Sequence, residues 1–242
     1  MKVVLYYKKY RDRRNCDQIM KIGGYMKRRL DAHVTMQKVV PNVTQSYRDL
    51  WKIPKEHQSV GFMSCDNEDV MWLAMDDATK KARITAVYAE TVYGGVEYSW
   101  SKFGGEITAV ISGETVSDVK NGLRYMQDFI ENRAQIYMLN EEGTLGYYAD
   151  WIPRAGKYYQ RTLGVKEGES IAYLVSTPVE STYALDKELK ASNTKIAQLF
   201  NTPSRVNTGG GIVVGTESAC RAAVEAFAEA VEYCAFHPMD LE

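Results

Sequence analysis

The feature of this chain that most constrains its fold is an internal repeat. The stretch Lys38–Ser64, KVVPNVTQSYRDLWKIPKEHQSVGFMS, has the same length as Asp150–Ser176, DWIPRAGKYYQRTLGVKEGESIAYLVS. Both contain an apolar residue before proline, a tyrosine and an aliphatic position at matching places. The likeness continues in Ala74–Ile84, AMDDATKKARI, and Ala184–Thr194, ALDKELKASNT. A repeat unit of about 100 residues has an ordinary domain size, so the 242 residues are expected to form two similar units.

A third matching pair locates the difference between the two copies. Gly104–Val119, GGEITAVISGETVSDV, parallels Gly209–Ala222, GGGIVVGTESACRA. In front of this pair the first copy carries the longer loop, and the part that the second copy lacks is Gly94–Phe103. The two copies are therefore expected to diverge in this loop.

Both copies contain the same pattern of secondary-structure signals. Short apolar runs predict strands at Val60–Met63, Ile107–Ile111, Ile171–Val175 and Ile212–Val214. Helices are expected over Asp76–Arg83, Asp186–Ser192, Thr115–Ile130 and Thr216–Phe236. An aspartate near the N-terminal end of each short helix would interact favourably with the helix dipole. The expected fold class is therefore α/β (α+β), with the helices of each copy packed on one small sheet.

The N-terminal arm differs from the rest of the chain in charge. Residues 1–30 carry ten Lys or Arg against two Asp, although the whole chain has a net charge of only −1. The helical spacing of its apolar residues predicts a short amphipathic helix over Asp17–Leu30. No DNA-reading motif accompanies the basic residues, so nucleic acid is not an expected partner. Docking on an acidic partner and a solvated extension both stay open.

Composition excludes several classes of protein. With 45% hydrophobic and 25% charged residues, the chain has the composition of an ordinary globular protein. No apolar run approaches the roughly 18–20 residues that span a bilayer, and the basic N-terminus lacks the apolar core of a secretory leader. The four cysteines and three histidines are scattered without metal-ligand spacing. We therefore expect no membrane, no metal and no cofactor, with free thiols in a reducing cytoplasm.

Nucleotide binding and catalysis are not indicated. The glycine-rich stretch Tyr93–Glu106, YGGVEYSWSKFGGE, lacks P-loop spacing and a helix that starts after it. The run TGGGIVVG at 208–215 leads into a strand, so no helix dipole would hold a phosphate there. Ser59, His57 and Asp66 could be written as a triad, but no Gly-x-Ser-x-Gly elbow is present. The chain is therefore not expected to be an enzyme, and no catalytic residue is assigned.

Together these motifs resemble the shell domain of bacterial microcompartments. That family combines an Ala/Asp-rich helix holding a lysine with a glycine-led strand and a further helix, as both copies do here. Trp151–Gly156, WIPRAG, is similar to the family's Ile-Pro-Arg turn, but it precedes the Ala/Asp helix of its own copy. This order implies a circular permutation, and the duplicated chain most resembles the ethanolamine-utilisation L-type of shell protein. The resemblance implies shell domains over residues 32–132 and 133–242, after a basic extension, residues 1–31.

The resemblance implies a structural part of a shell in the bacterial cytoplasm. Two domains per chain would make six around a threefold axis, so we expect a homotrimer that forms a flat, pseudohexameric tile. Its partners would be other shell proteins and the small metabolites that cross the tile. Lys80 and Lys190 occupy equivalent places and are expected at the tile edge, with Arg154 beside Lys190. For each lysine, a solvated helix position is the alternative.

The same resemblance implies a central pore on the threefold axis. The extra loop of the first copy would gate it, with glycines as hinges, aromatic side chains as a plug and charged side chains as rings near the axis. The residues expected in this gate are Gly94, Gly95, Glu97, Tyr98, Trp100, Lys102, Phe103 and Gly104. An ordinary aromatic surface loop is the alternative.

A smaller acidic pore within each subunit is also implied. The family holds a cationic amine there, and the matching positions in this chain are Glu68, Asp69 and Glu106. Carboxylates are suitable partners for an ammonium group. The chain departs from the family at Glu68, where the family has Asp, and near Ile136, where an aromatic residue is missing. A solvated strand end is the alternative for Asp66, Glu68 and Asp69.

A different class of function also fits the expected fold. The alternative is a soluble trimeric protein that binds a small molecule, as a sensor does, and never builds a shell. Flat two-dimensional arrays would favour the shell, whereas an isolated metabolite-binding trimer would favour the sensor. The basic arm is expected to contact cargo or an adjacent shell protein. The sequence leaves the enclosed pathway and the permeating metabolite open.

Overall fold

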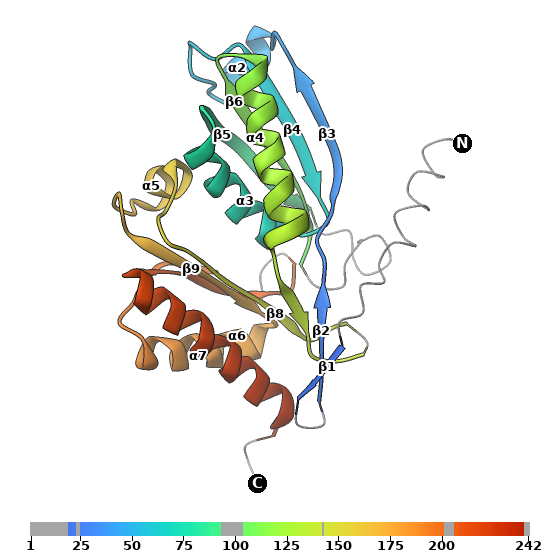
Figure 1. Ribbon diagram of the computed structural model, residues 1–242, viewed down its shortest axis with the longest axis vertical. Coiled ribbons are helices and arrows are strands. Elements are labelled where there is room, and N and C mark those ends of the chain that lie inside the picture. Colours follow the sequence, from blue (N-terminus) through green and yellow to red (C-terminus); the bar gives the residue numbers. More distant parts are fainter. Residues whose placement is uncertain (1–18, 23–24, 93–103, 142, 201–205, 240–242) are drawn as a thin grey trace, which may run out of the picture.

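The computed structural model describes residues 19–22, 25–92, 104–141, 143–200 and 206–239. Over these ranges the chain forms two α/β units that follow one another along the sequence, as the repeat predicts (Figure 1). Each unit is a sheet with helices packed on it. None of the helices in these ranges is both long and apolar enough to cross a membrane.

The first unit is built on a four-stranded antiparallel sheet. Its strands lie in the order β3 (Val34–Val40), β4 (Ser59–Cys65), β6 (Glu106–Gly113) and β5 (Ile84–Val92). The helices that follow β4 and β6 lie side by side on one face of this sheet; they are α3 (Glu68–Lys81) and α4 (Val116–Asp128) (Figure 1). A single π-helical turn, η1 (Phe129–Arg133), extends α4, and the short helix α2 (Gln45–Leu50) follows β3. Apolar side chains from the sheet and from both long helices form the core between them.

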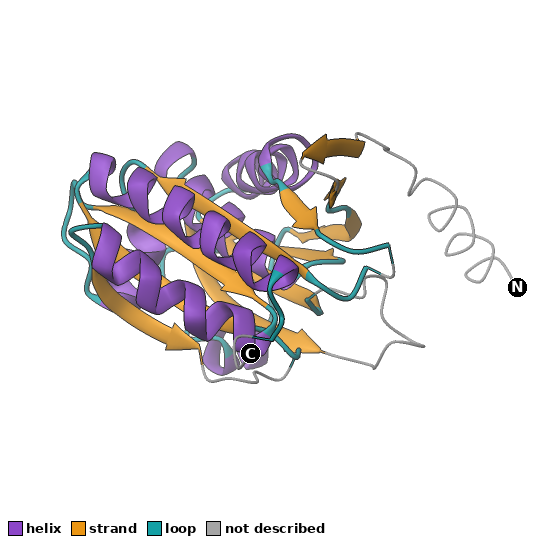
Figure 2. Cartoon of the chain, turned by 90° about the horizontal axis from the view of Figure 1, so that it is seen from below, coloured by secondary structure: helices purple, strands orange, loops and turns teal. Residues whose placement is uncertain are grey.

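The second unit repeats this arrangement. Its sheet contains, in order, β8 (Gly146–Ile152), β9 (Ser170–Ser176), β11 (Gly209–Gly215) and β10 (Lys195–Phe200). The long helices pack together across one face of the strands (Figure 2); they are α6 (Pro178–Ala191) and α7 (Glu217–Phe236). The short helix α5 (Lys157–Leu163) follows β8 as α2 follows β3. The predicted duplication and fold class are therefore confirmed.

The two sheets agree even in an irregularity. Each edge strand has a register shift against its neighbour, between Ala86 and Tyr88 in β5 and between Ile196 and Gln198 in β10. A bulge of this kind adds a residue to one strand and bends it. Because the shift falls at the same place in both copies, their positions can be compared residue by residue, for example Ala86 with Ile196.

The two shorter helices begin earlier than the sequence predicts. Helix α3 starts well before Asp76 because the Asn67 side chain accepts a backbone hydrogen bond of 3.2 Å from the first turn and caps the helix. Helix α6 starts with Pro178, at a position where a backbone amide has no partner within the helix. Asp76 and Asp186 consequently lie in the C-terminal halves of their helices, so the prediction that they adjoin the N-terminal ends was wrong.

The predicted helix over Asp17–Leu30 is also wrong. The described part of this segment forms two antiparallel strands, β1 (Ile19–Ile22) and β2 (Tyr25–Leu30). Strand β2 pairs with β7 (Ile136–Met138), which in turn pairs with β8, so the sheet of the second unit is extended to seven strands. A sheet edge offers unpaired backbone donors and acceptors, and pairing with it outweighs the weak helical signal of a short segment.

Candidate functional site

The two units meet where α3 of the first packs against α5 of the second. The carboxylate of Asp76 on α3 is buried and accepts two backbone hydrogen bonds, from Gly156 N (2.6 Å) and Tyr159 N (3.0 Å). Thr79 Oγ1 accepts a third, from Lys157 N (3.0 Å). Burial raises the pKa of Asp76, although the amides of Tyr159 and Gly156 stabilise its charged form. Side chains of one copy therefore hold the first turn of a helix in the other.

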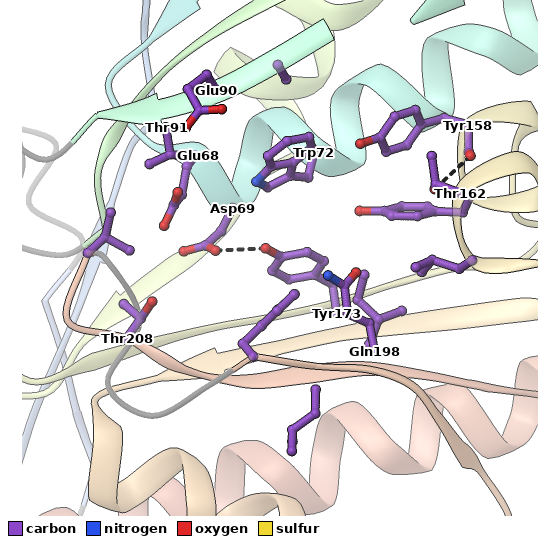
Figure 3. A pocket seen from close by; sticks show the side chains of 17 residues that line it. Glu68, Asp69, Trp72, Glu90, Thr91, Tyr158, Thr162, Tyr173, Gln198 and Thr208 are labelled. Carbon is purple, nitrogen blue, oxygen red and sulfur yellow. Dashed lines mark hydrogen bonds between the residues drawn. The ribbon is translucent and has the colours of Figure 1, made fainter. Parts of the chain in front are cut away.

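A cavity of about 710 Å³ lies between the two units. Helix α3 and strand β5 form one wall, and α5, β9 and β10 of the second unit contribute the other (Figure 3). Its polar and aromatic lining includes Glu68, Asp69, Trp72, Thr91, Tyr158, Tyr173 and Phe200. Because both copies contribute walls, the cavity exists only through their tandem arrangement.

Two adjacent carboxyl groups at the start of α3 line this cavity (Figure 3). Asp69 Oδ1 accepts a hydrogen bond from the Tyr173 hydroxyl (2.9 Å), whereas the buried Oδ2 has no hydrogen-bond partner among the described residues. Burial and the neighbouring charge of Asp69 raise the pKa of Glu68 to about 8. A hydrogen bond with Thr91 lowers the pKa of Glu68 but does not outweigh these two effects. Burial likewise raises the pKa of Asp69 to about 7. The pair therefore retains protons near neutral pH that a bound cation would displace.

Aromatic rings line the cavity beside the acidic pair (Figure 3). Trp72 and Tyr158 stack with their ring centroids 6.1 Å apart, and the ring centroid of Tyr173 lies 5.3 Å from that of Phe200. The faces of such rings attract cations through their quadrupole and also pack against apolar groups. Carboxyl groups at one end and rings along the walls suit a small organic cation, whose charged group would meet the acids and whose carbon atoms would meet the rings.

Known proteins match this chain over most of its length. A family model described as the BMC domain matches residues 59–138. The bacterial microcompartment shell protein EutL of Clostridium perfringens (strain 13 / Type A) is 36% identical over 207 residues, which cover 86% of this chain and 95% of that protein. EutL of Escherichia coli (strain K12) is 33% identical over 206 residues, covering 85% and 94%. This chain belongs to the EutL family of bacterial microcompartment shell proteins.

The fold of this EutL-family chain agrees with that assignment. The crystal structure of ethanolamine utilization protein EutL from Leptotrichia buccalis C-1013-b matches it with a TM-score of 0.82 at 41% sequence identity. The match covers 88% of this chain and 98% of that one. The resemblance to the permuted, L-type shell proteins that the sequence motifs indicated is thereby confirmed.

In this EutL-family chain, two of the three residues predicted for an acidic pore lie together. Glu68 and Asp69 both line the cavity. Glu106 begins β6 and is not among the described residues that line it. The alternative of a solvated strand end is wrong for Glu68 and Asp69, which are buried in the first turn of α3. Asp66 lies outside the helix, where its Oδ2 is 3.1 Å from Nδ1 of His33.

Sequence reasoning missed the aromatic wall of the cavity. Trp72 lies three residues after Asp69 on α3, a spacing that places two side chains on one face of a helix, so this member could have been found. Tyr158 and Tyr173 come from the second copy, about one repeat further along the chain. Only the packing of the second unit against α3 brings these two rings to the acidic pair.

Most residues predicted for the central gate lie outside the described residues. These are Gly94, Gly95, Glu97, Tyr98, Trp100, Lys102 and Phe103. Gly104, which follows them, has a φ of +77°, and a Cβ added to it would lie 2.8 Å from Asn67 Nδ2. Glycine is therefore required here by the backbone at the entrance to β6, whatever the loop before it does.

The residues predicted for the tile edge have different surroundings in the two units. Lys80 Nζ donates a hydrogen bond to the Arg154 carbonyl (3.0 Å) and pairs with Asp77 (3.1 Å), so it joins α3 to the turn before α5. Lys190 is exposed near the end of α6 and pairs with Asp186 (2.5 Å). The carbonyl of Arg154 thus meets Lys80, whereas the sequence placed Arg154 beside Lys190.

Proposed function

We propose that three copies of this chain form a pseudohexameric tile of a cytoplasmic microcompartment shell, and that each copy binds a small ammonium compound in its cavity. Membership of the EutL family supports the proposed shell tile. Two similar units joined head to tail meet through two different surfaces, which is a heterologous contact. Repeating this contact closes a ring when the rotation from each unit to the next is a whole fraction of a full turn. Six units, from three chains, would complete it, and other shell proteins would meet the tile at its edges.

The observation that carries the ligand proposal is the unpaired carboxylate oxygen of Asp69. A buried acceptor without a partner costs about 1–3 kcal/mol, more when it is charged. A primary ammonium group has three N–H donors, so it can donate to this oxygen and to the carboxylate of Glu68 at once. Ethanolamine, which appears in the name of the Leptotrichia relative, is the first compound to test.

Ligand binding would exchange protons for the cation. Without a ligand, burial and mutual repulsion favour the protonated carboxyl groups, whereas an entering ammonium group would stabilise both ionised forms. The Tyr173 hydroxyl would hold Asp69 through Oδ1 and leave Oδ2 free for the ligand. Trp72 and Tyr158 would contact the carbon atoms of the ligand. Affinity would therefore rise with pH up to about 8, because fewer protons need to be displaced.

Calorimetric titration with ethanolamine at about pH 8 is expected to show binding to the wild-type protein. The Glu68→Gln, Asp69→Asn double variant is expected to bind at least about tenfold more weakly, because the amide oxygens still accept hydrogen bonds but carry no charge, and a hydrogen bond to a neutral group contributes about 1 kcal/mol less than one to a charged group. The Glu114→Gln variant removes an exposed carboxylate before α4 and should bind as the wild type does.

Ethylene glycol provides the matching test of charge recognition, since it replaces the ammonium group with a neutral hydroxyl. It is expected to bind far more weakly than ethanolamine. Equal affinity for the two compounds, or full retention of ethanolamine binding by the double variant, would contradict a cation site at Glu68 and Asp69.

We also propose that Lys80 and Lys190 lie at the tile edge. An exposed contact contributes only about 0–1 kcal/mol, but a lattice repeats it along many edges. The Lys80→Ala, Lys190→Ala double variant is therefore expected to lose two-dimensional sheets in electron micrographs while keeping the native mass of the wild type. Lys120→Ala, on the exposed side of α4, is the control. Sheets that form unchanged in the double variant would refute the edge assignment.

Gating by Gly94–Phe103 and contact of the N-terminal arm with cargo or with an adjacent shell protein stay predictions. We place the boundary between the two shell domains at residues 132 and 133, near the end of η1, because the repeat resumes with β7 and β8. A soluble sensor is not favoured, because shell proteins match the chain along most of its length.

A further inference from the structure

The N-terminal extension is held against the second unit beside the C-terminal end of α7 (Figure 1). Its strand β2 pairs with β7, in a register that sets Arg28 opposite Met138 and Arg29 opposite Tyr137. Because side chains alternate between the two faces of a sheet, Lys27 lies on the same face as Arg29 and Tyr137. Tyr137 packs on this face against the core beneath α7, so the Lys27 side chain also points toward that helix.

The ammonium group of Lys27 is enclosed by a carboxylate and two aromatic rings. Its Nζ donates a hydrogen bond of 2.7 Å to Oε1 of Glu232 on α7. The same Nζ lies 4.4 Å from the ring centroid of Tyr137 and 5.3 Å from that of Tyr147. A cation within about 6 Å of a ring centroid is attracted by the quadrupole of the ring. The Lys27 and Glu232 side chains are 21% and 27% exposed, so solvent screens this contact less than it screens an exposed ion pair.

Contacts that do not involve Lys27 position the carboxylate and both rings. Tyr147 is 2% exposed, and its hydroxyl donates a hydrogen bond of 2.7 Å to the same Oε1 of Glu232. Tyr137 stands opposite Tyr147 in the pairing of β7 with β8, with the ring centroids 5.5 Å apart, and its hydroxyl donates to Gln135. The last turn of α7 contains no Lys or Arg, although a positive charge is favourable at the C-terminal end of a helix. The second unit thus supplies a preformed site that lacks only a cation.

We propose that the cage formed by Tyr137, Tyr147 and Glu232 is a binding site for a primary alkylammonium group, and that Lys27 is its tethered ligand. None of these residues lines the acidic cavity, so the cage is a second site. It acts as a latch for the N-terminal extension, because with Lys27 in the cage β1 and β2 continue the sheet of the second unit. With the cage vacated, β2 keeps three residue pairs with β7, a short ladder that holds a hairpin weakly.

The latch gives the extension a fixed place on the tile. Residues 1–30 carry ten Lys or Arg against two Asp, and the extension is expected to contact cargo or an adjacent shell protein. With Lys27 in the cage, that contact starts from the end of α7. With the cage empty and β2 released, β7 exposes the backbone groups that β2 now pairs, as the edge of a sheet does.

The tether decides which ammonium group occupies the cage. Linking a ligand to its site gives the ligand an effective concentration in the millimolar range. A free amine therefore displaces Lys27 only at comparable concentrations. The Lys27→Ala variant offers an empty cage to a free amine, and n-propylammonium is the part of the lysine side chain that this substitution removes.

Hydrogen exchange followed by mass spectrometry tests the latch in the full chain. In Lys27→Ala, the backbone amides of β2 and β7 are expected to exchange about tenfold faster or more, because a hydrogen bond between charged groups is lost. Lys27→Met keeps an unbranched apolar side chain without the charge and is expected to exchange nearly as fast as Lys27→Ala. The matched control, Lys38→Ala, removes an exposed lysine from β3 and should exchange as the wild type does.

A calorimetric titration tests the cage as an ammonium site. The protein used carries Glu68→Gln and Asp69→Asn, so that the acidic cavity is neutral and an amine bound there does not contribute. In this protein, Lys27→Ala is expected to bind n-propylammonium at least about tenfold more tightly than the chain that keeps its tethered lysine. 1-Propanol, in which a hydroxyl replaces the ammonium group, is not expected to bind measurably. Adding Glu232→Gln should abolish the binding of n-propylammonium.

Three results would overturn the proposal. Exchange in β2 and β7 that stays as slow in Lys27→Ala and Lys27→Met as in the wild type would show that the ammonium group does not hold the hairpin. Faster exchange without binding of n-propylammonium to the emptied cage would show that Lys27 contributes only packing. Equal binding of n-propylammonium with and without Lys27 would show that the amine binds elsewhere on the protein.

Discussion

Replacing Asp76 with alanine is expected to lower the free energy of unfolding by about 2–4 kcal/mol. The carboxylate accepts backbone hydrogen bonds from Gly156 and Tyr159, and each hydrogen bond to a charged group contributes about 1.5–3 kcal/mol. Alanine would leave both amides without this acceptor in a buried contact, although relief of a buried charge offsets part of the loss. Urea unfolding at one fixed protein concentration, followed by tryptophan fluorescence, measures the change.

Two further variants serve as comparisons for the loss of stability in Asp76→Ala. Asp76→Asn keeps one oxygen and is expected to lose less stability than Asp76→Ala, because one of the two amides retains an acceptor. Asp128→Ala, on the exposed side of α4, is expected to change the free energy of unfolding by no more than about 0.5 kcal/mol. If Asp76→Ala costs no more than Asp128→Ala, the carboxylate does not hold α5 on α3.

The free energy of unfolding of the ligand-free protein is expected to fall by several kcal/mol as the pH rises from about 5 to about 8. Burial raises the pKa of Glu68 from 4.5 to about 8 and that of Asp69 from 3.8 to about 7. In this range the folded protein holds protons that the unfolded chain has released. Because the folded state binds more protons, its stability decreases with rising pH, by about 1.4 kcal/mol for each unit of a pKa difference.

The Glu68→Gln, Asp69→Asn double variant isolates this effect, and urea midpoints measured across the same pH range should decline less in it than in the wild type. Two histidines with shifted pKa values also contribute to the pH dependence of stability: the hydrogen bond with Asp66 raises the pKa of His33, and burial lowers that of His57. Both are present in either protein, so the difference between the two curves belongs to the acidic pair. Parallel curves would show that the pair carries no excess protons in the folded state.

The acidic pair could be located from the sequence, but its chemistry could not. Glu68 and Asp69 are neighbours in the chain, and the family resemblance pointed to both. The raised pKa values depend on burial beneath the second unit. The hydroxyl of Tyr173, 104 residues away from Asp69, donates to Oδ1 and leaves Oδ2 free, and this hydrogen bond lowers the pKa of Asp69 against the effect of burial. The pattern near Asp69 contains no trace of that distant partner.

Local signals failed where a tertiary contact competed with them. The spacing of apolar residues over Asp17–Leu30 suits a helix, yet the described part pairs as strands because β7 provides a sheet edge. The start of α3 is set by the cap at Asn67, a signal that the sequence itself contains. The strand pairing of the N-terminal segment depends on a sheet edge more than 100 residues away, whereas the cap of α3 is a local signal.

The sequence by itself determined the duplication, the order of elements in each unit and the family, because a repeat is a property of the covalent chain. Only the tertiary structure decided which copy of a shared surface is covered. Helix α3 receives α5 within the chain, whereas α6 stays open, although both helices occupy the same place in their units. The physical reason is that two units joined head to tail make one contact, between α3 and α5. The equivalent surfaces on α6 and on α2 are then left uncovered at the two ends of the pair. The burial that raises the pKa values of Glu68 and Asp69 follows from that contact, and their place as neighbours in the chain adds the repulsion that raises the pKa of Glu68 further.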